Sequence, residues 1–416
     1  MSRRAVIVGA GVIGLSTAYH LARKSYGSVT VVEKGRVGDG ASSRAAGIIT
    51  GLLWSETGIL ARKISLTRFR ELSGELDGYR YQDVGCLNLF DAASWPERER
   101  LLPLYDRLGV EYTVMDCTEM VAAWPDLALS GEPIGLFDPL GGYSEPDHYL
   151  PALADGCRAL GVEIREDCMV SDFIMDGGRM AGVIADGRRI EADAVVSTVH
   201  VWTLKVLETI GLQLPLKSFV HQRYVTAPLP APIRIPAVNA NPYGGYIRPH
   251  YGQRLLAGIE NPEAPEFRVP GRDFHMSTIA PPPGLGEAAR ENLLPLVPGA
   301  WRAGQAGSTG RVDRAAHSGW EIEKAGLLSF SADGEPVLGP VERFPGLYVG
   351  VAFHSGGFAY NPAAGVLLAG CVADGRPEID IGEFSPDRFD PQETEAYNRT
   401  RITHGEYSMP GHSRRH

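Results

Sequence analysis

The sequence contains no long hydrophobic run, and this absence argues against a membrane protein. No apolar stretch approaches the roughly 20 residues that a membrane-spanning helix requires, so we expect no membrane partner. Residues 1–4 lead directly into a strand-like run, which leaves no room for a signal peptide. The sequence therefore predicts a soluble protein of the cytoplasm.

Cysteine is scarce and is not arranged for metal binding. The five cysteines are scattered along 416 residues and form no C-x-x-C pair. This usage is typical of reduced thiols in a reducing compartment, and we predict no metal site. Acidic residues outnumber basic ones, giving a formal net charge of −10. A net acidic surface repels phosphate backbones, so nucleic acid is a poor candidate partner.

The chemistry of the chain begins with an apolar run that ends in a glycine-rich turn. Residues 5–8 are all apolar, as in a strand buried on both faces of a parallel sheet, and residues 9–14 read G-x-G-x-x-G. Helical spacing then continues to Arg23, and a second buried strand, residues 29–32, ends at Glu33. Because all these parts occur in order, the segment predicts a dinucleotide-binding unit.

Each part of this dinucleotide-binding unit has a structural role. Gly9 permits the tight turn, Gly11 lets the backbone approach a pyrophosphate, and Gly14 lets helix and strand pack closely. The helix N-terminus offers free N–H groups and a positive dipole end to the phosphates. Glu33 can accept hydrogen bonds from ribose hydroxyls, and its charge would repel a 2′-phosphate.

The residues after the second strand favour FAD over NAD. Lys34 is followed by a small-residue segment, residues 38–47, that contains Ser42, Ser43 and Arg44. Two hydroxyls and a cation among small residues suit a chain wrapped against phosphates and a flat ring. The alternative interpretation of this segment is a solvent loop.

With these motifs, the chain resembles the D-amino-acid oxidase superfamily of flavoproteins. Within it, the sequence is most similar to the sarcosine and dimethylglycine dehydrogenase branch, with glycine oxidase as a cousin. The resemblance extends over residues 5–374. Residues 41–47 resemble the loop beneath the flavin, residues 221–226 and 245–249 the sarcosine-like branch, and residues 331–339 the T-P-D-G-x-P-x-x-G signature.

Three positions depart from the family pattern. Arg44 stands where several of these dehydrogenases carry a histidine that is covalently attached to the flavin, so the resemblance implies noncovalent FAD. His200 replaces the glycine of an A-A-G-x-W turn, although Trp202 is retained, which leaves the backbone geometry of that turn open. Leu328 follows a G-L pair where glycine and D-amino-acid oxidases carry the arginine that holds the substrate carboxylate.

The resemblance implies a fold of the α/β plus α+β class, with a Rossmann-like FAD-binding domain and a second antiparallel-sheet substrate domain. The expected segments are 1–78, 145–218 and 325–390 for the FAD-binding domain, 79–144 and 219–324 for the substrate domain, and 391–416 for a partly mobile extension. The residues expected to contact FAD are Gly9, Gly11, Val12, Ile13, Gly14, Glu33, Lys34, Ser42, Ser43, Arg44, Ala46, Gly47, Val170, Trp202, Gly356, Gly357 and Phe358.

Catalytic candidates come from the covering sheet and from a second glycine-rich turn. Tyr246 and Arg248 lie two apart on a predicted strand, hence on one face, where a hydroxyl and a cation would hold a carboxylate. The alternative is a surface arginine beside a packed tyrosine. His354 would tune the flavin or accept a proton, and an ordinary buried histidine is the alternative. Weaker candidates are His221, His250 and His317.

The sequence thus predicts FAD-dependent oxidation of a secondary or tertiary amine or an N-methyl amino acid. Hydride transfer to flavin N5 would give an imine that hydrolyses, and O2 or a carrier protein would accept the electrons. Two other interpretations stay open. One is a flavin hydroxylase or hydroxy-acid oxidase, and the other is a flavin-carrying subunit that needs a partner. The sequence leaves open the exact substrate and the oligomeric state.

Overall fold

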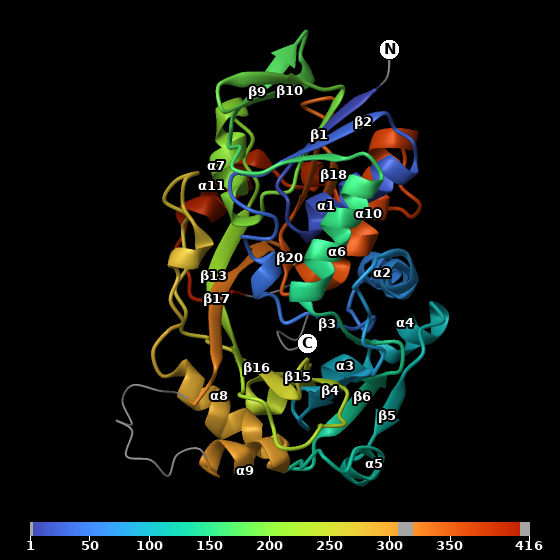
Figure 1. Ribbon diagram of the computed structural model, residues 1–416, viewed down its shortest axis with the longest axis vertical. Coiled ribbons are helices and arrows are strands. Elements are labelled where there is room, and N and C mark those ends of the chain that lie inside the picture. Colours follow the sequence, from blue (N-terminus) through green and yellow to red (C-terminus); the bar gives the residue numbers. More distant parts are fainter. Residues whose placement is uncertain (1–2, 307–318, 408–416) are drawn as a thin grey trace.

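The computed structural model describes residues 3–306 and 319–407, and its first part is built on a mostly parallel sheet (Figure 1). Neighbouring strands are parallel except the first, which is antiparallel to the second. In spatial order they are β18 (Val337–Pro340), β19 (Leu347–Val351), β12 (Ala194–Ser197), β1 (Arg4–Val8), β2 (Ser28–Val32) and β8 (Glu163–Arg165).

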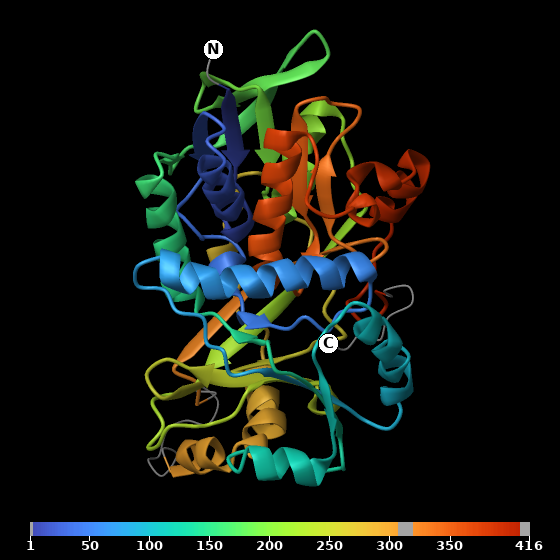
Figure 2. The same ribbon diagram turned by 90° about the vertical axis from the view of Figure 1, so that its right-hand side faces the viewer.

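Helices cover this sheet and separate it from the rest of the molecule (Figure 2). The helices α1 (Val12–Arg23) and α10 (Gly357–Asp374) pack closely, because a side chain at Gly365 would collide with Ser16. Helix α6 (Pro146–Ala159) also packs on α1. The long helix α2 (Glu56–Glu75) crosses between this sheet and the second part.

Helix α10 begins earlier than the sequence predicts. The apolar run in the sequence predicts a helix from about Pro362 to Val372, but the helix begins at Gly357, so that a proline lies inside it. The proline has no N–H for the carbonyl oxygen of Phe358. The side-chain amide of Asn361 donates to that oxygen at 2.6 Å and itself accepts from the Tyr149 hydroxyl at 2.7 Å. The proline is therefore tolerated inside the helix.

The second part is built on a mixed sheet in which all neighbours are antiparallel except β14 and β4. In spatial order its strands are β20 (Phe353–His354), β17 (Ile322–Ser331), β13 (Leu216–Val225), β16 (Arg254–Ile259), β15 (Gly245–His250), β14 (Ala237–Ala240), β4 (Cys86–Phe90), β6 (Ile134–Asp138) and β5 (Thr113–Met115). The ten-residue strands β13 and β17 pair along their whole length and run from the first part into the second (Figure 1).

Short helices lie around the second sheet, and small sheets flank both parts. The helices are α3 (Trp95–Glu99), α4 (Leu102–Arg107), α5 (Cys117–Ala123), α8 (Leu285–Leu293) and α9 (Pro298–Ala306). The small sheets contain β9 (Val170–Asp176), β10 (Arg179–Ala185) and β11 (Arg188–Glu191), and the pair β3 (Ile48–Ile49) and β7 (Gly142–Tyr143). The hairpin expected at residues 182–187 is the β10–β11 connection. The helix expected over residues 285–296 is α8 followed by a 3-10 turn.

One predicted strand is divided between the two sheets. The apolar run of residues 349–353 predicted a single buried strand, but β19 ends at Val351 in the first sheet and β20 begins at Phe353 in the second. Ala352 lies between them with a φ of +58°, a left-handed conformation that ends extended pairing. The apolar pattern alone could not show this turn.

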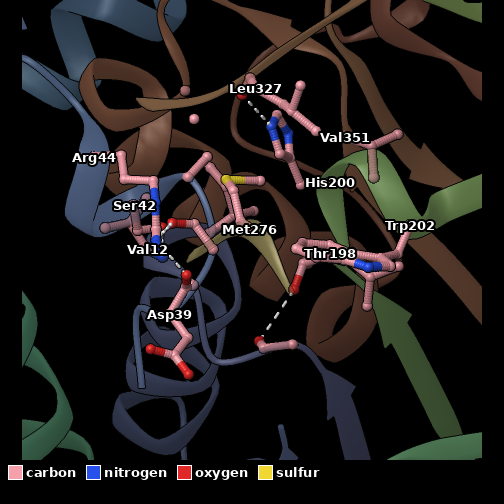
Figure 3. A pocket seen from close by; sticks show the side chains of 18 of the residues that line it. Val12, Asp39, Ser42, Arg44, Thr198, His200, Trp202, Met276, Leu327 and Val351 are labelled. Carbon is pink, nitrogen blue, oxygen red and sulfur yellow. Dashed lines mark hydrogen bonds between the residues drawn. The ribbon is translucent and has the colours of Figure 1, made fainter. Parts of the chain in front are cut away.

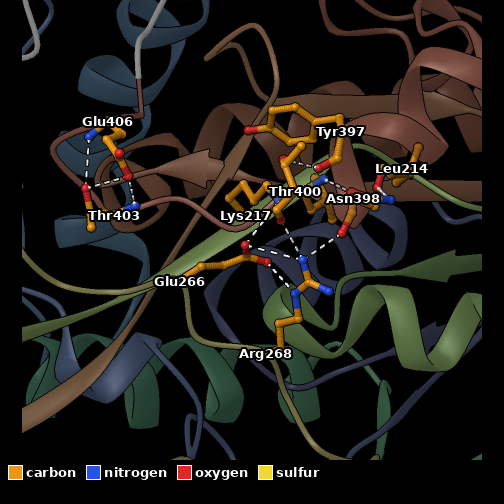
Figure 4. Close-up of polar contacts among 10 residues, drawn as sticks. Leu214, Lys217, Glu266, Arg268, Tyr397, Asn398, Thr400, Thr403 and Glu406 are labelled. Atoms are coloured by element: carbon orange, nitrogen blue, oxygen red, sulfur yellow. Dashed lines mark hydrogen bonds and ion pairs between the residues drawn. The ribbon is translucent and has the colours of Figure 1, made fainter.

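A buried ion-pair cluster ties the C-terminal segment to β13 (Figure 4). The Lys217 ammonium donates to Glu266 at 3.1 Å and to the carbonyl oxygen of Thr400 at 2.6 Å. Arg268 donates to Glu266 at 2.8 Å and to the same carbonyl at 2.7 Å. The side chains of Lys217 and Glu266 are 0% and 4% exposed, so the carboxylate compensates a charge inside the protein.

The predicted C-terminal extension is structured over its described length. Residues 391–399 form α11 (Pro391–Arg399), and Tyr407 is buried with its hydroxyl donating to the carbonyl oxygen of Ser331 at 2.7 Å. Residues 408–416 of the expected mobile end lie outside the described residues. The domain boundaries stay a prediction. Strand β13 crosses the boundary expected at residue 218, and strand β17 crosses the boundary expected at residue 325.

Candidate active site

A cavity lies where the carboxyl ends of four strands of the first sheet face the second sheet (Figure 3). Strands β1, β2, β12 and β19 lead into its lining, the position at which open α/β sheets bind ligands. The predicted residues that line it are Gly9, Gly11, Val12, Ile13, Glu33, Lys34, Ser42, Arg44, Ala46, Val170, Trp202, Tyr246, His354, Gly357 and Phe358. The predicted residues outside its lining are Gly14, Ser43, Gly47, Arg248 and Gly356.

The glycine-rich turn has the geometry that its spacing predicts. Gly9 has a φ of +105°, and its N–H donates to the carbonyl oxygen of Val32 at 2.9 Å. A side chain at Gly14 would collide with the Gly9 carbonyl, so the third glycine allows helix α1 to pack against the turn. The N–H of Val12, in the first turn of α1, donates to the Ser42 hydroxyl at 3.0 Å.

The carboxylate of Glu33 is held in the cavity wall by the backbone on either side. One oxygen accepts the N–H of Ala10 at 2.8 Å, and the other accepts the N–H of Gly35 at 2.9 Å. Burial raises the pKa of Glu33, and the two N–H donors oppose this rise. Each oxygen keeps a lone pair for a further donor, which fits ribose hydroxyls.

Lys34 does not stand free in the cavity. Its ammonium donates to the carbonyl oxygens of Arg272, at 2.8 Å, and Phe274, and lies 4.0 Å from the ring centre of Trp202. Burial lowers the pKa of Lys34. The lysine therefore fixes a loop between β16 and α8 over the cavity. Sequence reasoning missed this loop, because only the folded chain brings Met276 and its neighbours to the site (Figure 3).

The small-residue segment after Lys34 forms a tight wall of the cavity. Residues 42–44 form a 3-10 turn, and Arg44 donates to the carbonyl oxygens of Asp39 and, at 2.8 Å, Gly40. Gly47 has a φ of +72°, and a side chain there would collide with the Ser144 carbonyl. This segment contains an arginine side chain at the cavity, as predicted from its position.

His200, which stands where the family pattern has a glycine, adopts a backbone conformation that glycine favours. Its φ is +47°, in the left-handed region, and its Nε2 is 2.8 Å from the carbonyl oxygen of Leu327 (Figure 3). Because the carbonyl accepts, Nε2 carries the proton, and burial lowers the pKa of His200. Trp202 donates to the Phe274 carbonyl at 3.1 Å. Thr198, which the sequence reasoning missed, donates to the Val8 carbonyl at 3.0 Å.

The second glycine-rich turn closes the other side of the cavity. Its N–H at Gly356 donates to Nδ1 of His354 at 3.2 Å, so that nitrogen is an acceptor and the proton lies on Nε2. His354 itself has a φ of +46° and packs 5.1 Å from the ring of Trp54. Gly357 and Phe358 begin α10 and line the cavity. The N-terminus of α10 therefore points its free N–H groups toward this part of the cavity.

A histidine and a tyrosine from the second sheet meet in the cavity wall. Nε2 of His221 on β13 lies 3.1 Å from the hydroxyl of Tyr246 on β15, and both side chains line the cavity. Burial lowers the pKa of His221 to about 4, and it raises that of Tyr246 well above its usual range. Near neutral pH the pair is therefore an uncharged imidazole and a protonated phenol. The sequence placed Tyr246 at the site, but ranked His221 below His354.

The structure corrects the role predicted for Arg248. The guanidinium is fully buried and donates to both oxygens of Glu145, at 2.8 and 2.9 Å, and to the carbonyl of Ala46 at 2.6 Å. Burial alone would raise the pKa of Glu145, but Arg248 and His250 hold it at about 2. The charge of Arg248 is already compensated by a carboxylate of the protein. Arg248 is therefore engaged by Glu145 and does not present its charge to a substrate carboxylate.

Two weaker histidine candidates from the sequence remain, His250 and His317. Nδ1 of His250 lies 2.9 Å from Glu145, so this side chain belongs to the ion pair of Arg248. His317 lies outside the described residues. No group of three or more potential metal ligands occurs in residues 3–306 and 319–407. Over the same residues, no helix has the length and apolar content needed to cross a bilayer.

Comparison with known proteins identifies the family. A model described as FAD dependent oxidoreductase (DAO) matches residues 4–370. The chain is 28% identical over 93% of its length to 4-methylaminobutanoate oxidase (formaldehyde-forming) of Paenarthrobacter nicotinovorans, covering 45% of that protein. It is 26% identical over 92% of its length to human mitochondrial sarcosine dehydrogenase, covering 41% of it. The chain thus spans about half the length of these two relatives.

Other relatives are similar in length to the chain. It is 27% identical to sarcosine oxidase subunit beta of an Arthrobacter species, over 92% of this chain and 90% of that one. Among solved structures, L-proline dehydrogenase from P. horikoshii superimposes with a TM-score of 0.81, over 93% of this chain and 98% of that one at 21% identity. The similarity to L-proline dehydrogenase supports the fold, which agrees with the fold class predicted from the sequence.

Proposed function

Because the chain belongs to the family of FAD-dependent oxidoreductases, we propose that it oxidises a secondary or tertiary amine or an N-methyl amino acid to an imine that hydrolyses. One observation carries the proposal: a continuous cavity joins the dinucleotide turn at residues 9–14 to the His221–Tyr246 pair. The names of its relatives, 4-methylaminobutanoate oxidase and sarcosine dehydrogenase, favour N-methylated substrates.

The residues present fit FAD. A side chain at Gly14 would collide with the Gly9 carbonyl, so only glycine fits at this position of the turn. The turn can then present backbone N–H groups to a pyrophosphate. Glu33 offers buried carboxylate oxygens to a ribose. The ring system would then extend toward the turn at Gly356 and Gly357. Arg44, in place of a histidine, supports noncovalent binding.

When bound, FAD would supply the acceptor for a hydride from the carbon next to the amine nitrogen. The chain contributes orientation of the amine. Tyr246 and His221 form an uncharged pair, in which the phenol can donate a hydrogen bond to His221 Nε2 while its oxygen accepts a hydrogen bond from the N–H of a secondary amine. The apolar residues around the pair, among them Leu327 and Val351, exclude water from the nitrogen.

Anaerobic flavin bleaching tests the proposed reaction. We expect sarcosine, dimethylglycine or 4-methylaminobutanoate to remove the 450 nm flavin absorbance, with at least one faster than glycine or L-proline. Bleaching by NADH alone would indicate a hydroxylase, and bleaching by a hydroxy acid would indicate a hydroxy-acid oxidase. Either result would contradict amine oxidation.

Tyr246→Phe tests the pair directly. The variant should retain FAD and reduce it several-fold more slowly, because a hydrogen bond that orients the amine, worth about 0.5–1.5 kcal/mol, is lost. Tyr243→Phe is the matched control, because its hydroxyl bonds the exposed Ser130 backbone away from the cavity. A Tyr246→Phe variant that matches Tyr243→Phe in rate would remove the phenol from the mechanism.

One observation favours a second candidate, a flavin-carrying subunit. The chain covers 90% of the length of a protein named as a subunit of sarcosine oxidase. In that case the isolated chain would bind FAD and become reduced by an amine, but would not turn over with O2 or a small electron acceptor. Steady turnover by the isolated chain would exclude this candidate.

A further inference from the structure

Helix α2 carries a buried arginine next to the second glycine-rich turn. Arg62 is 3% exposed, and its guanidinium lies 4.1 Å from the ring centre of Tyr360. A side chain at Gly356 would collide with Nη2 of Arg62, so the guanidinium is in contact with the start of α10. Gly356 is therefore required to let the cation approach the helix N-terminus.

This cation has no counter-ion in the part of the chain that the structure describes. Arg62 forms no ion pair with a carboxylate there, and its Nε has no hydrogen-bond partner. The carboxyl groups on either side are engaged elsewhere. Asp138 accepts from Thr50 at 2.9 Å, and Glu335 accepts from the indole of Trp54 at 2.7 Å.

One of the two neighbouring carboxyl groups, Glu335, is also a poor source of negative charge. Burial raises the pKa of Asp138 above its usual value, and it raises that of Glu335 to about 7. Glu335 is thus partly protonated near neutral pH. Asp138 favours the positive charge of Arg62 without forming an ion pair with it, so the guanidinium lies beside the positive end of the α10 dipole with no carboxylate in direct contact. An uncompensated buried charge is unfavourable unless an anion comes to the same place.

The cavity is the place where such an anion would come. Ser355 and Gly357, on either side of Gly356, line it, while the dinucleotide turn lies at its other end. With the ADP part of FAD at the turn, the ring system would occupy the end of the cavity that Ser355 and Gly357 line, and Arg62 lies behind that turn, against Gly356. Transfer of a hydride, two electrons and one proton, turns the neutral amine into an iminium cation and the neutral ring into a monoanion. Its negative charge is delocalised over N1 and the C2 oxygen.

We propose that Arg62 is a positioning residue that acts with the α10 N-terminus to stabilise this negative charge. The inference rests on the proposed function, since each turnover creates the anion, but it is independent of which amine is oxidised. Arg62 acts through space across the Gly356–Gly357 turn and does not need to touch substrate. It would raise the reduction potential of the bound flavin.

Sulfite titration of the FAD-loaded protein tests the inference without an amine. Sulfite adds to flavin N5 and leaves the same negative charge on the ring. Arg62→Met should bind sulfite at least tenfold more weakly, and its reduction potential should fall by about 30 mV for each tenfold change in the two-electron equilibrium. Arg62→Lys retains the charge and should stay within about threefold of the wild type.

The matched control is Arg98→Met. Arg98 is also buried, at 4% exposed, but it donates to the Leu52 carbonyl and the Tyr105 hydroxyl, whereas Arg62 lies against Gly356 at the start of α10. This control should lose stability without losing sulfite affinity. Arg62→Met with wild-type sulfite affinity would overturn the inference. If Arg62→Met does not bind FAD, the Arg62→Lys variant provides the test. An Arg62→Lys variant that retains FAD but loses sulfite affinity would show that the shape of the arginine, rather than its charge, determines sulfite binding.

Failure of the proposed function gives a different result. A wild-type protein that no amine reduces, but whose sulfite affinity depends on Arg62, would refute amine oxidation and leave the charge assignment intact. If an amine reduces the flavin but neither the sulfite affinity nor the reduction potential depends on Arg62, amine oxidation would stand and the charge assignment would be refuted.

Discussion

Replacing Arg248 by methionine removes the positive charge that compensates Glu145 and leaves most of the side-chain volume in place. Both guanidinium–carboxylate bonds, at 2.8 and 2.9 Å, are lost together with the bond to the carbonyl oxygen of Ala46. Glu145 would then be 4% exposed, with only His250 and the N–H of Tyr251, at 3.2 Å, as close partners. The variant therefore contains a buried carboxylate that has lost its main counter-ion.

The expected cost follows from this geometry. Removing one partner of a buried pair typically lowers the free energy of unfolding by about 3–5 kcal/mol. Arg254→Met is the matched control, because Arg254 pairs with Glu321 at 2.7 Å in a partly exposed position, where an ion pair contributes about 0–1 kcal/mol. Glu145→Gln combined with Arg248→Met should recover part of the loss, since no charge then stays buried.

Urea unfolding of the FAD-saturated protein measures this cycle, with tryptophan and flavin fluorescence followed together. The structural interpretation would be refuted by an Arg248→Met variant as stable as Arg254→Met. It would also fail if Arg248→Met kept its stability and lost only its reduction by carboxylated amines. That second result would restore Arg248 as the cation for a substrate carboxylate, as the sequence first suggested.

Three further predictions concern the cofactor and acid stability. FAD should be released into the supernatant on acid precipitation, because Arg44 replaces the attaching histidine of relatives, and colour in the pellet would contradict this. Glu33→Ala should weaken FAD binding at least tenfold, since hydrogen bonds to a charged acceptor contribute about 1.5–3 kcal/mol each; FAD retained through dialysis would exclude the role. Burial lowers the pKa of His20 to about 3, so the unfolded chain gains a proton below about pH 6.5 that the folded chain does not. Relative to His20→Asn, the wild type should lose about 3 kcal/mol between pH 6.5 and 4 in urea titrations, and equal slopes would refute the shift.

Local patterns in the sequence were sufficient to predict the dinucleotide-binding unit. The order of strand, glycine turn, helix, strand and acid depends on neighbours in the chain, and the structure has β1, α1 and β2 at the expected residues. The position of Glu33 at a carboxyl strand end follows from the same order. Parallel pairing of β1 with β12, nearly 190 residues away, required the family resemblance.

Contacts between distant segments could not be predicted in the same way. Tyr246 and Arg248 share one strand face, as the two-residue period requires, yet only Tyr246 reaches the cavity. The difference is Glu145, which α6 brings beside Arg248 from more than 100 residues away. His221 reaches Tyr246 from another strand, and no local motif marks that pairing. An ion pair across the fold decided the role of Arg248, and a hydrogen bond between two strands decided that of His221.

Three residues other than glycine adopt a left-handed backbone conformation in or next to the cavity wall. His200, Ala352 and His354 all have positive φ, and each such non-glycine residue costs on the order of 1–3 kcal/mol. Two of the three offset that cost with their rings: His200 bonds the Leu327 carbonyl, and His354 accepts the Gly356 N–H. Glycine at either position would relieve strain but lose a bond that joins the two sheets or orders the α10 turn. The imidazoles therefore hold the cavity wall in shape, a role that a glycine motif in a sequence cannot reveal.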